Sequence, residues 1–397
     1  MTYLRAGPVA ALLAALALAN TARATPPDPR LDLPGFLEHV VALACPAPTE
    51  GGALLGDRLG AAALLESGDE GARPGSFEWR FRLVSKDEVR VIRLAPGGRL
   101  RQLAVELYQT IGRDRTRPRA VALADEDCAI ELGRRIDYDL DGSPTALVML
   151  DSDLVETGKR EPLEPPVPAG TDPGGVRVAL IDSGVNYTLP MIASRLARDP
   201  AGGGLGYDFW DLDPRPFDGD SHRSPFFPQR HGTAVASILI REAPTASLVP
   251  YRYPRPDLDR FADLIADAAA KKVRVVNMAL GSRRRADWNA FLEAARAHPE
   301  LLFVVSAGNN GRSIEDDPVY PAALALDNML VVTSSDRFGH LAPGSNWGPQ
   351  HVDLMVFGEQ QPVIDFKGNL GHASGSSFAV PRVSALAVRL LASHPDW

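Results

Sequence analysis

The sequence of 397 residues has only two cysteines, an aromatic content of 7% and no excess of positive charge. Its 42 basic residues are outnumbered by 50 acidic ones, so the formal net charge is −8 and nothing indicates a nucleic-acid-binding protein. The remaining composition, 45% hydrophobic and 23% charged, is typical of a globular protein long enough for two domains. Abundant proline (34) and glycine (35) predict many loops and at least one extended linker.

Long hydrophobic runs are also missing. The apolar run Val9–Ala19 follows the basic Arg5 and precedes the small-residue site Ala22-Arg23-Ala24, which is the pattern of a secretory signal peptide over residues 1–24. The run is too short for a helix that crosses a bilayer of about 30 Å, although an uncleaved anchor is the alternative. No later segment could span a membrane, so we expect a secreted or periplasmic protein with no membrane contact after signal cleavage.

The two cysteines are Cys45 and Cys128. In an exported protein, a disulfide between them would close one long N-terminal loop. Two unpaired, buried thiols are the alternative, and the compartment favours the disulfide.

Residues 25–160 have the pattern of a small α+β domain. Phe77–Leu83 and Val89–Val91 alternate between apolar and polar residues, which predicts half-buried strands of an antiparallel sheet. The apolar residues of Leu100–Ile111 recur at helical spacing and predict a helix. Ile136–Asp151 resembles a hairpin.

The turn of this hairpin has the opening residues of a calcium-binding loop. Asp137, Asp139, Asp141 and Gly142 occupy the first positions of such a loop. The twelfth position, which requires a bidentate glutamate, is Val148. A solvated hairpin turn is therefore the favoured interpretation.

A proline-rich spacer over residues 161–175 separates this domain from residues 176–397. There, short apolar runs alternate with helical segments, which predicts a parallel sheet with crossover helices. The predicted strands are Val176–Ile181, Ser247–Tyr251, Val273–Leu280, Leu301–Ser306, Met329–Thr333 and Val352–Phe357. The predicted helices are Gly232–Arg241, Leu258–Lys271, Ala286–Ala297 and Phe378–Ala392. In such sheets, active sites collect at the carboxyl ends of the strands.

Four polar residues fall at these ends or at the helix starts. Asp182 ends a run of apolar residues, His231 opens a helix of small residues, Asn309 follows a strand, and Ser377 precedes the last helix. Each also has a structural interpretation, as a turn residue, a structural histidine, a turn asparagine or a helix cap. A carboxylate such as Asp182 is costly to bury without a partner, and a helix N-terminus favours developing negative charge near Ser377.

Together, these residues resemble the subtilisin-like serine proteases (subtilases), whose triad follows the chain order Asp, His, Ser. The matching motifs are Ile181–Val185 (IDSGV), His231–Ala236 (HGTAVA), Asn277–Gly281 (NMALG), Ala307–Gly311 (AGNNG) and Gly375–Pro381 (GSSFAVP). The resemblance covers about residues 176–397 and not the N-terminal third. It implies a three-layer α/β fold with a mostly parallel central sheet.

The resemblance also implies an exported serine endopeptidase that acts on protein or peptide substrates. Ser377 would be the nucleophile, His231 its general base, and Asp182 the group that orients the imidazole. Asn309 and the Ser377 backbone N–H would hold the oxyanion. The residues implied for substrate binding are Ala279, Leu280 and Gly281. No cofactor would be required, although some subtilases bind structural calcium.

Several residues depart from the family pattern. Ser376 stands where threonine is usual, Phe378 and Val380 are bulkier than the usual residues, and the chain ends at Trp397, before the usual further element. These departures keep a catalytically inactive, subtilase-fold binding module as the alternative function. An α/β-hydrolase esterase is disfavoured because no Gly-x-Ser-x-Gly motif surrounds Ser377 and the triad order differs. The N-terminal domain would be either a propeptide or a retained accessory domain.

The loop before His231 is rich in aspartate. Calcium binding and recognition of basic substrate residues are the functional interpretations, and a solvated acidic loop is the favoured one because no ligand spacing is diagnostic. Its acidic residues are Asp208, Asp211, Asp213, Asp218 and Asp220.

Overall fold

The computed structural model describes residues 26–48, 51–69, 75–113 and 115–397. The signal peptide predicted for residues 1–24 lies outside this described part. The chain forms two compact units, one of residues 1–135 with 149–158 and one of residues 136–148 with 159–397. Among the described residues, no helix combines the length and the apolar character needed to cross a membrane.

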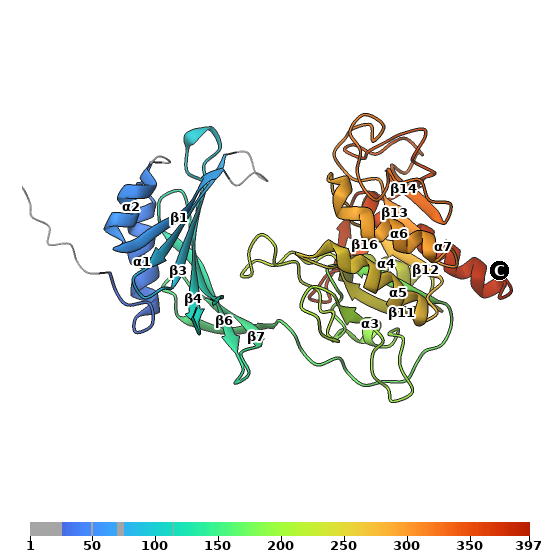
Figure 1. Cartoon of the computed structure of the whole chain (residues 1–397), viewed down its shortest axis with the longest axis horizontal. Helices are drawn as coiled ribbons and strands as arrows, with labels where there is room; N and C mark the ends of the chain where they lie inside the picture. Colours follow the sequence, from blue (N-terminus) through green and yellow to red (C-terminus); the bar gives the residue numbers. More distant parts are fainter. Residues whose placement is uncertain (1–25, 49–50, 70–74, 114) are drawn as a thin grey trace, which may run out of the picture. The chain divides into compact units, whose positions relative to one another are not determined.

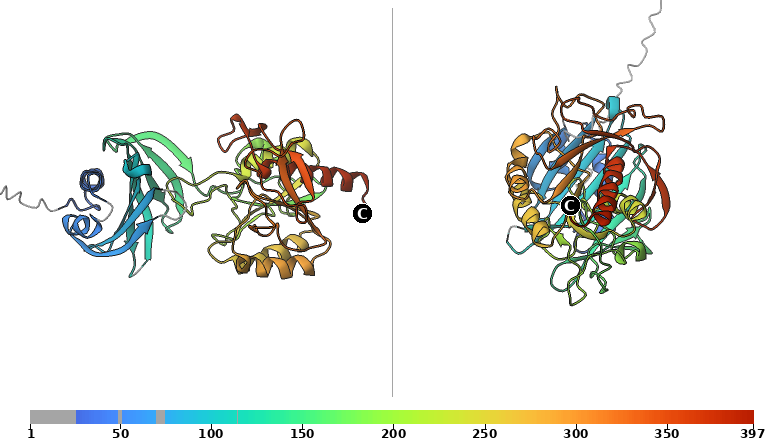
Figure 2. Two further views of the ribbon diagram at one scale, coloured as in Figure 1. Left: turned by 90° about the horizontal axis from the view of Figure 1, so that it is seen from above. Right: turned by 90° about the vertical axis from the view of Figure 1, so that its right-hand side faces the viewer.

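The N-terminal region is an α+β structure, as the sequence predicts. Its eight strands form one sheet in which each strand lies beside the next in sequence, and the pairs from β1 to β6 are antiparallel. The two helices, α1 and α2, lie on one face of this curved sheet (Figures 1 and 2). The elements are α1 (Leu33–Ala44), α2 (Gly52–Arg58), β1 (Ala61–Asp69), β2 (Ser76–Leu83), β3 (Glu88–Leu94), β4 (Gln102–Ile111), β5 (Arg115–Ala124), β6 (Ile130–Tyr138), β7 (Pro144–Leu150) and β8 (Glu156–Pro162).

The helix predicted for Leu100–Ile111 is wrong, because this segment is strand β4. Leu103, Val105 and Leu107 are all fully buried, and their spacing of two residues is that of one face of a strand. Some apolar residues of this strand also lie three or four positions apart, which is why the sequence pattern resembled that of a helix. Pairing with β3 on one side and β5 on the other decides the conformation here.

The disulfide favoured by the compartment is formed between Cys45 and Cys128. Cys45 caps the C-terminal end of α1, and Cys128 lies in the turn between β5 and β6. The bond therefore ties the first helix to the sheet on which it packs, across 83 positions of sequence.

The turn that resembles a calcium loop is a hairpin turn. One carboxylate oxygen of Asp139 accepts hydrogen bonds from the backbone N–H groups of Asp141 and Ser143, at 3.0 and 2.9 Å. The same two bonds recur in the neighbouring turns that begin at Asp125 and Asp151. These aspartates are present because they satisfy backbone donors within tight turns.

The second unit contains a seven-stranded sheet in the order β10-β11-β9-β12-β13-β14-β15, and all its pairs are parallel (Figure 1). All six predicted strands are confirmed as β9 (Arg177–Asp182), β11 (Ser247–Arg252), β12 (Val275–Met278), β13 (Leu302–Ser306), β14 (Met329–Ser335) and β15 (Leu354–Phe357). The short β10 (Tyr207–Asp208) and the hairpin of β16 (Gln361–Ile364) and β17 (Leu370–Ala373) are not predicted.

Helices cover both faces of this sheet and make three layers. Along β9, Val178 and Leu180 pack into the core on the side of α4 and α7, whereas Ala179 and Ile181 pack into the core on the side of α5 and α6. Because β9 is buried on both faces, its sequence is a nearly continuous apolar run instead of an alternating pattern. The helices are α3 (Pro190–Ala193), α4 (Gly232–Glu242), α5 (Phe261–Ala270), α6 (Asn289–Ala297) and α7 (Ser376–Ser393).

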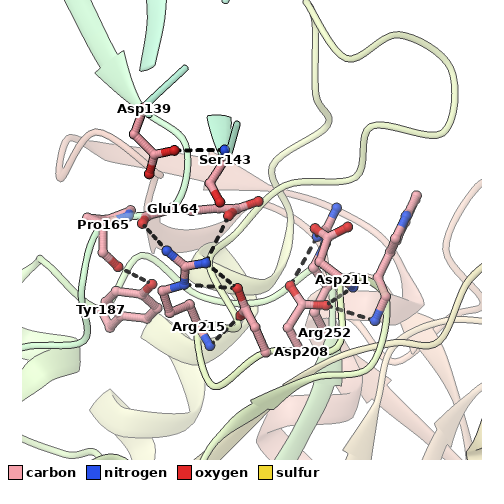
Figure 3. Close-up of polar contacts among 11 residues, drawn as sticks. Asp139, Ser143, Glu164, Pro165, Tyr187, Asp208, Asp211, Arg215 and Arg252 are labelled. Carbon is pink, nitrogen blue, oxygen red and sulfur yellow. Dashed lines mark hydrogen bonds and ion pairs between the residues drawn. The ribbon is translucent and has the colours of Figure 1, made fainter. Parts of the chain in front are cut away.

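The first part of the proline-rich segment makes specific contacts within the second unit. We call residues 161–168 the strap. At its start, the Glu161 carboxylate lies 2.6 Å from the guanidinium of Arg230, and both side chains are mostly buried. Further along, the hydroxyl of Tyr187 donates a hydrogen bond of 2.6 Å to the carbonyl oxygen of Pro165 (Figure 3). These contacts satisfy polar groups that a solvated linker would leave to water.

Glu164 of the strap lies among other acidic side chains. Its carboxylate is 3.4 Å from Arg215, which also pairs with Asp213 at 2.5 Å (Figure 3). Burial and the negative charges of Asp211 and Asp213 raise the pKa of Glu164 to about 7, although Arg215 opposes them. The folded strap therefore binds a proton more tightly than the unfolded chain does.

This shift predicts a pH-dependent contribution to stability. Because the pKa of Glu164 in the folded protein exceeds its ordinary value of 4.5, its stabilising contribution is full below about pH 4.5 and is lost as the pH rises through about 7. Glu164→Gln resembles the protonated form at every pH. As the pH rises from 4.5 to 8, we expect the free energy of unfolding of the variant, measured in urea, to rise by about 2 kcal/mol relative to that of the native protein.

Glu293→Gln is the matched control, because Glu293 lies on the exposed face of α6. The difference in free energy of unfolding between Glu293→Gln and the native protein should stay nearly constant with pH. A gap for Glu164→Gln that stays constant or shrinks as the pH rises would contradict the prediction.

Candidate functional site

The predicted site residues come from different segments that meet at the carboxyl edge of the parallel sheet. From β9 the chain passes to β11 on one side and later returns to β12 on the other, so the strand order reverses at β9. Asp182 is the last residue of β9, Ala279 follows β12, and Asn309 follows β13. His231 precedes the first residue of α4, and Ser377 lies in the first turn of α7, at the helix start that the sequence predicts.

Asp182 and His231 are in direct contact. The Nδ1 atom of His231 lies 2.8 and 2.9 Å from the two carboxylate oxygens of Asp182. Burial disfavours the imidazolium, but the charge and hydrogen bond of Asp182, with the charge of Asp218, outweigh it and raise the pKa of His231 above its ordinary value. The approach requires glycine at position 232, since a Cβ there would lie 2.0 Å from the carbonyl oxygen of Gly184.

A second buried carboxylate, Asp218, lies behind this pair. It is fully buried, and its oxygens accept hydrogen bonds from the hydroxyls of Ser183 (2.6 Å) and Thr233 (2.5 Å) and from the backbone N–H of Thr233 (3.0 Å) and His231 (3.2 Å). The Ser183 backbone N–H donates to Asp182 at 2.7 Å. Asp218 thus joins both members of the Asp–His pair through one hydrogen-bond network.

The prediction of a solvated acidic loop is therefore wrong for Asp218, and it is also wrong for Asp208. Asp208 is 2% exposed and accepts a hydrogen bond of 3.0 Å from Arg252, which also pairs with Asp211 (Figure 3). Burial raises the pKa of Asp208 to about 6 against the opposing charge of Arg252. Asp220 of the same acidic loop accepts a hydrogen bond of 2.6 Å from the hydroxyl of Tyr253.

Asp218, Asp208 and Asp220 thus accept hydrogen bonds from groups of the protein itself. Within the part of the chain that the structure describes, no group of three or more His, Cys, Asp or Glu side chains is arranged to hold a metal ion. Arginine side chains and backbone N–H groups neutralise or satisfy these carboxylates instead.

Asn309 is held by the residue before the predicted nucleophile. Its side-chain oxygen accepts hydrogen bonds from both the backbone N–H and the hydroxyl of Ser376, each at 2.9 Å. The Ser376 hydroxyl also contacts that of Ser306 at 2.7 Å. With its oxygen engaged, the Asn309 amide presents its NH₂ group to a further acceptor. Gly375 has a φ of 126°, which other residues rarely adopt, and so permits the turn into α7.

The Ser377 hydroxyl is directed at a backbone carbonyl in this conformation. It donates a long hydrogen bond of 3.4 Å to the carbonyl oxygen of Ala279, and among the described residues no hydrogen bond joins it to His231. The ring of Phe378 packs against that of His231, with centroids 5.6 Å apart. The bulkier residue at 378 is therefore accommodated beside the histidine, and Val380 is fully buried.

A cleft of about 380 Å³ opens beside these residues. Asp182 and His231 line it, and so do the three residues predicted to bind substrate. Its lining residues are Asp182, Ser183, Asp220, Gln229, His231, Tyr253, Arg255, Leu258, Phe261, Ala279, Leu280, Gly281, Ser282 and Trp288.

The sequence interpretation missed part of this lining. Tyr253 and Arg255 follow directly after β11, so the rule that sites collect at the carboxyl ends of strands would have included them. Asp218 carries no comparable signal, because nothing in its neighbouring residues distinguishes it from the exposed aspartates of the same loop.

Comparison with known proteins gives the same assignment for the second unit. Residues 174–397 match the subtilase family (Peptidase_S8). The chain is 31% identical over 235 residues to the thermophilic serine proteinase of Bacillus sp. strain AK1, covering 55% of this chain and 53% of the relative. It is 27% identical over 232 residues to the cell wall-associated protease of Bacillus subtilis strain 168, covering 55% of this chain and 24% of the relative.

A crystal structure of a cold adapted subtilisin-like serine proteinase is 25% identical, covers 59% of this chain and 81% of that chain, and has a TM-score of 0.46. The chain spans about half the length of the first curated relative and about a quarter of the second. The family match covers more than half of the chain and includes every predicted site residue. The chain therefore belongs to the subtilase family.

Proposed function

We propose that this protein is an exported serine endopeptidase that hydrolyses peptide bonds through Asp182, His231 and Ser377. The observation that carries the proposal is the contact between Asp182 and His231 Nδ1 in the lining of a cleft, whose wall at Ala279 also contacts the Ser377 hydroxyl. Membership of a family of serine peptidases supports it.

The geometry suits general-base chemistry. With Nδ1–H donated to Asp182, the imidazole of His231 has its other nitrogen, Nε2, free to accept a proton. Ser377 would turn from the Ala279 carbonyl toward this nitrogen as substrate enters, since catalytic hydrogen bonds often tighten only in the complex. Its Oγ would then attack the scissile carbonyl while His231 takes the proton and later delivers it to the leaving amine.

The developing oxyanion needs donors that are already in position. The NH₂ group of Asn309 is one, because Ser376 holds the amide oxygen. The backbone N–H of Ser377 is the other, since N–H groups in the first turn of a helix have no partner within the helix. A water would then hydrolyse the acyl-enzyme, and every step uses side chains of this chain without a cofactor.

The alternative function is an inactive binding module of the same fold. The observation that favours it is the missing hydrogen bond between Ser377 and His231 in this conformation. A fluorophosphonate probe distinguishes the two, because it labels a serine only when a base activates the hydroxyl. Labelling of Ser377 supports the protease, and a folded but unlabelled protein supports the binding module.

Export and processing form the second part of the proposal. Residues 1–24 would be removed as a signal peptide, and the N-terminal unit would act either as a propeptide or as a retained accessory domain. Sequencing the N-terminus of the mature protein distinguishes these roles. A start shortly after residue 24 supports an accessory domain, and a start near the strap supports a propeptide.

Single substitutions should lower casein hydrolysis in a definite order. We expect Ser377→Ala to lose on the order of 10⁶ in kcat, because it removes the nucleophile. Asn309→Ala should lose about 10²–10³, because it removes one oxyanion donor. Initial rates of cleavage measured on folded variants check both values.

Ser374→Ala is the matched control, because Ser374 is exposed and lies three residues before the nucleophile. It should retain the native rate. Equal rates for the native protein and Ser377→Ala would refute the proposed nucleophile.

Asp218 should influence the pH profile through His231. Its charge helps to raise the pKa of His231, so the imidazole becomes a competent base only as the pH rises above that raised value. Asp218→Asn removes the charge and keeps the size. We expect the acid limb of the kcat/KM profile to move to lower pH while kcat falls roughly tenfold, because the hydrogen-bond network around His231 is disturbed.

Asp336→Asn controls for the loss of one carboxylate, since Asp336 forms an ordinary surface turn. Its profile should coincide with that of the native protein. A purely structural role of Asp218 would lower stability and leave the acid limb where it is, which would contradict the prediction.

A further inference from the structure

Part of the lining of the cleft beside the predicted triad is apolar. The rings of Phe261 and Trp288 stack there, with centroids 5.1 Å apart, and Leu258 lies beside them. Asp182, His231 and the segment that follows β12 line the same cleft. A peptide with its reacting carbonyl near Ser377 would therefore extend one of its side chains into the cleft.

Three charged side chains besides His231 line the cleft, and two of them already have partners. Asp182 is engaged by His231 and by the backbone of Ser183. Asp220 accepts hydrogen bonds from the hydroxyl of Tyr253 and from a backbone N–H. Burial and the Asp220 carboxylate raise the pKa of Tyr253, so the phenol keeps its proton and stays a donor.

Arg255 is the exception. It makes no hydrogen bond or ion pair with any residue that the structure describes, and its Nε–H is buried without an acceptor. Its guanidinium faces the ring of Tyr253 at 5.7 Å from the centroid. The side chain lines the cleft and is not hydrogen-bonded by any described residue. A guanidinium also offers paired donors that match the two oxygens of a carboxylate.

We propose that Arg255 makes the cleft select peptides with an acidic side chain, glutamate or aspartate, within a few residues of the scissile bond. The proposal rests on the proposed function for the identity of the ligand as a peptide. The substrate carboxylate binds the guanidinium of Arg255, and the methylene groups of the peptide pack on Leu258 and Leu280, the half-buried leucines of the lining.

Asp220 is the competing charge, because it lines the same cleft and would favour basic side chains. Its two internal donors reduce its capacity for a ligand, whereas Arg255 has all its donors available. The balance between these two groups decides the charge preference, and the hydrogen-bond partners favour Arg255.

Peptide binding to the full chain with Ser377→Ala tests the proposal without requiring catalysis. Fluorescein-labelled peptides of alanine and leucine would carry one glutamate at successive positions, each paired with the same peptide containing glutamine. We expect the glutamate peptide to bind roughly tenfold more tightly than its glutamine partner at one position, by fluorescence anisotropy. Adding Arg255→Gln should make the glutamate and glutamine peptides bind equally tightly. Adding Arg255→Glu should make a lysine-containing peptide bind more tightly than its glutamine partner.

Arg337→Glu, on an exposed loop outside the cleft lining, makes the same change in net charge and should keep the native ratio. The same peptides incubated with the unsubstituted protein report cleavage by mass spectrometry. Selective binding without cleavage would overturn the proposed hydrolase and retain the role of Arg255. The role of Arg255 would be overturned by cleavage or binding that shows no preference for glutamate or a preference for lysine. It would also be overturned if the glutamate preference remained after Arg255→Gln.

Discussion

The structure of the site depends on one buried carboxylate at the end of the central strand. Asp182 terminates β9, at the point where the strand order reverses, and it is 4% exposed. A charge in that position is tolerable only if donors surround it. His231 and the backbone of Ser183 are those donors, so the burial of Asp182 and the orientation of the imidazole are consequences of the same contacts.

The neighbouring acidic residues follow the same rule with different partners. Asp218 uses hydroxyls and backbone N–H groups, whereas Asp208 uses Arg252. Each carboxylate is removed from water, so the donors around it must be held in fixed positions. The loop before the histidine is therefore held by polar contacts inside the protein, and its acidic composition says little about solvent exposure.

The sequence was sufficient for features that depend on local pattern. Apolar runs predicted all six longer strands of the parallel sheet, and five of these strands, all except β15, are buried along most of their length. The pattern misled at Leu100–Ile111, where apolar residues fit two periods and only pairing with neighbouring strands decides between them.

Partners distant in sequence were beyond prediction for a physical reason. Asp218 lies 35 positions from Ser183, and Arg230 lies 69 positions from Glu161, so no local pattern links them. The small-residue motifs around Asp182, His231 and Ser377 were informative because they permit close backbone approach. Gly232, which leaves no room for a Cβ beside Gly184, is the clearest example.

The strap bears on where the subtilase unit begins. The family match starts at residue 174, after the strap. Yet Glu161 pairs with Arg230, whose guanidinium also packs on the ring of Phe366, 4.0 Å from its centroid. The next residue is His231, whose backbone N–H lies 3.2 Å from Asp218. The strap contacts Arg230, and the buried Asp218 contacts the next residue, His231. As a physical unit, the subtilase domain therefore includes residues of the strap that the family match does not.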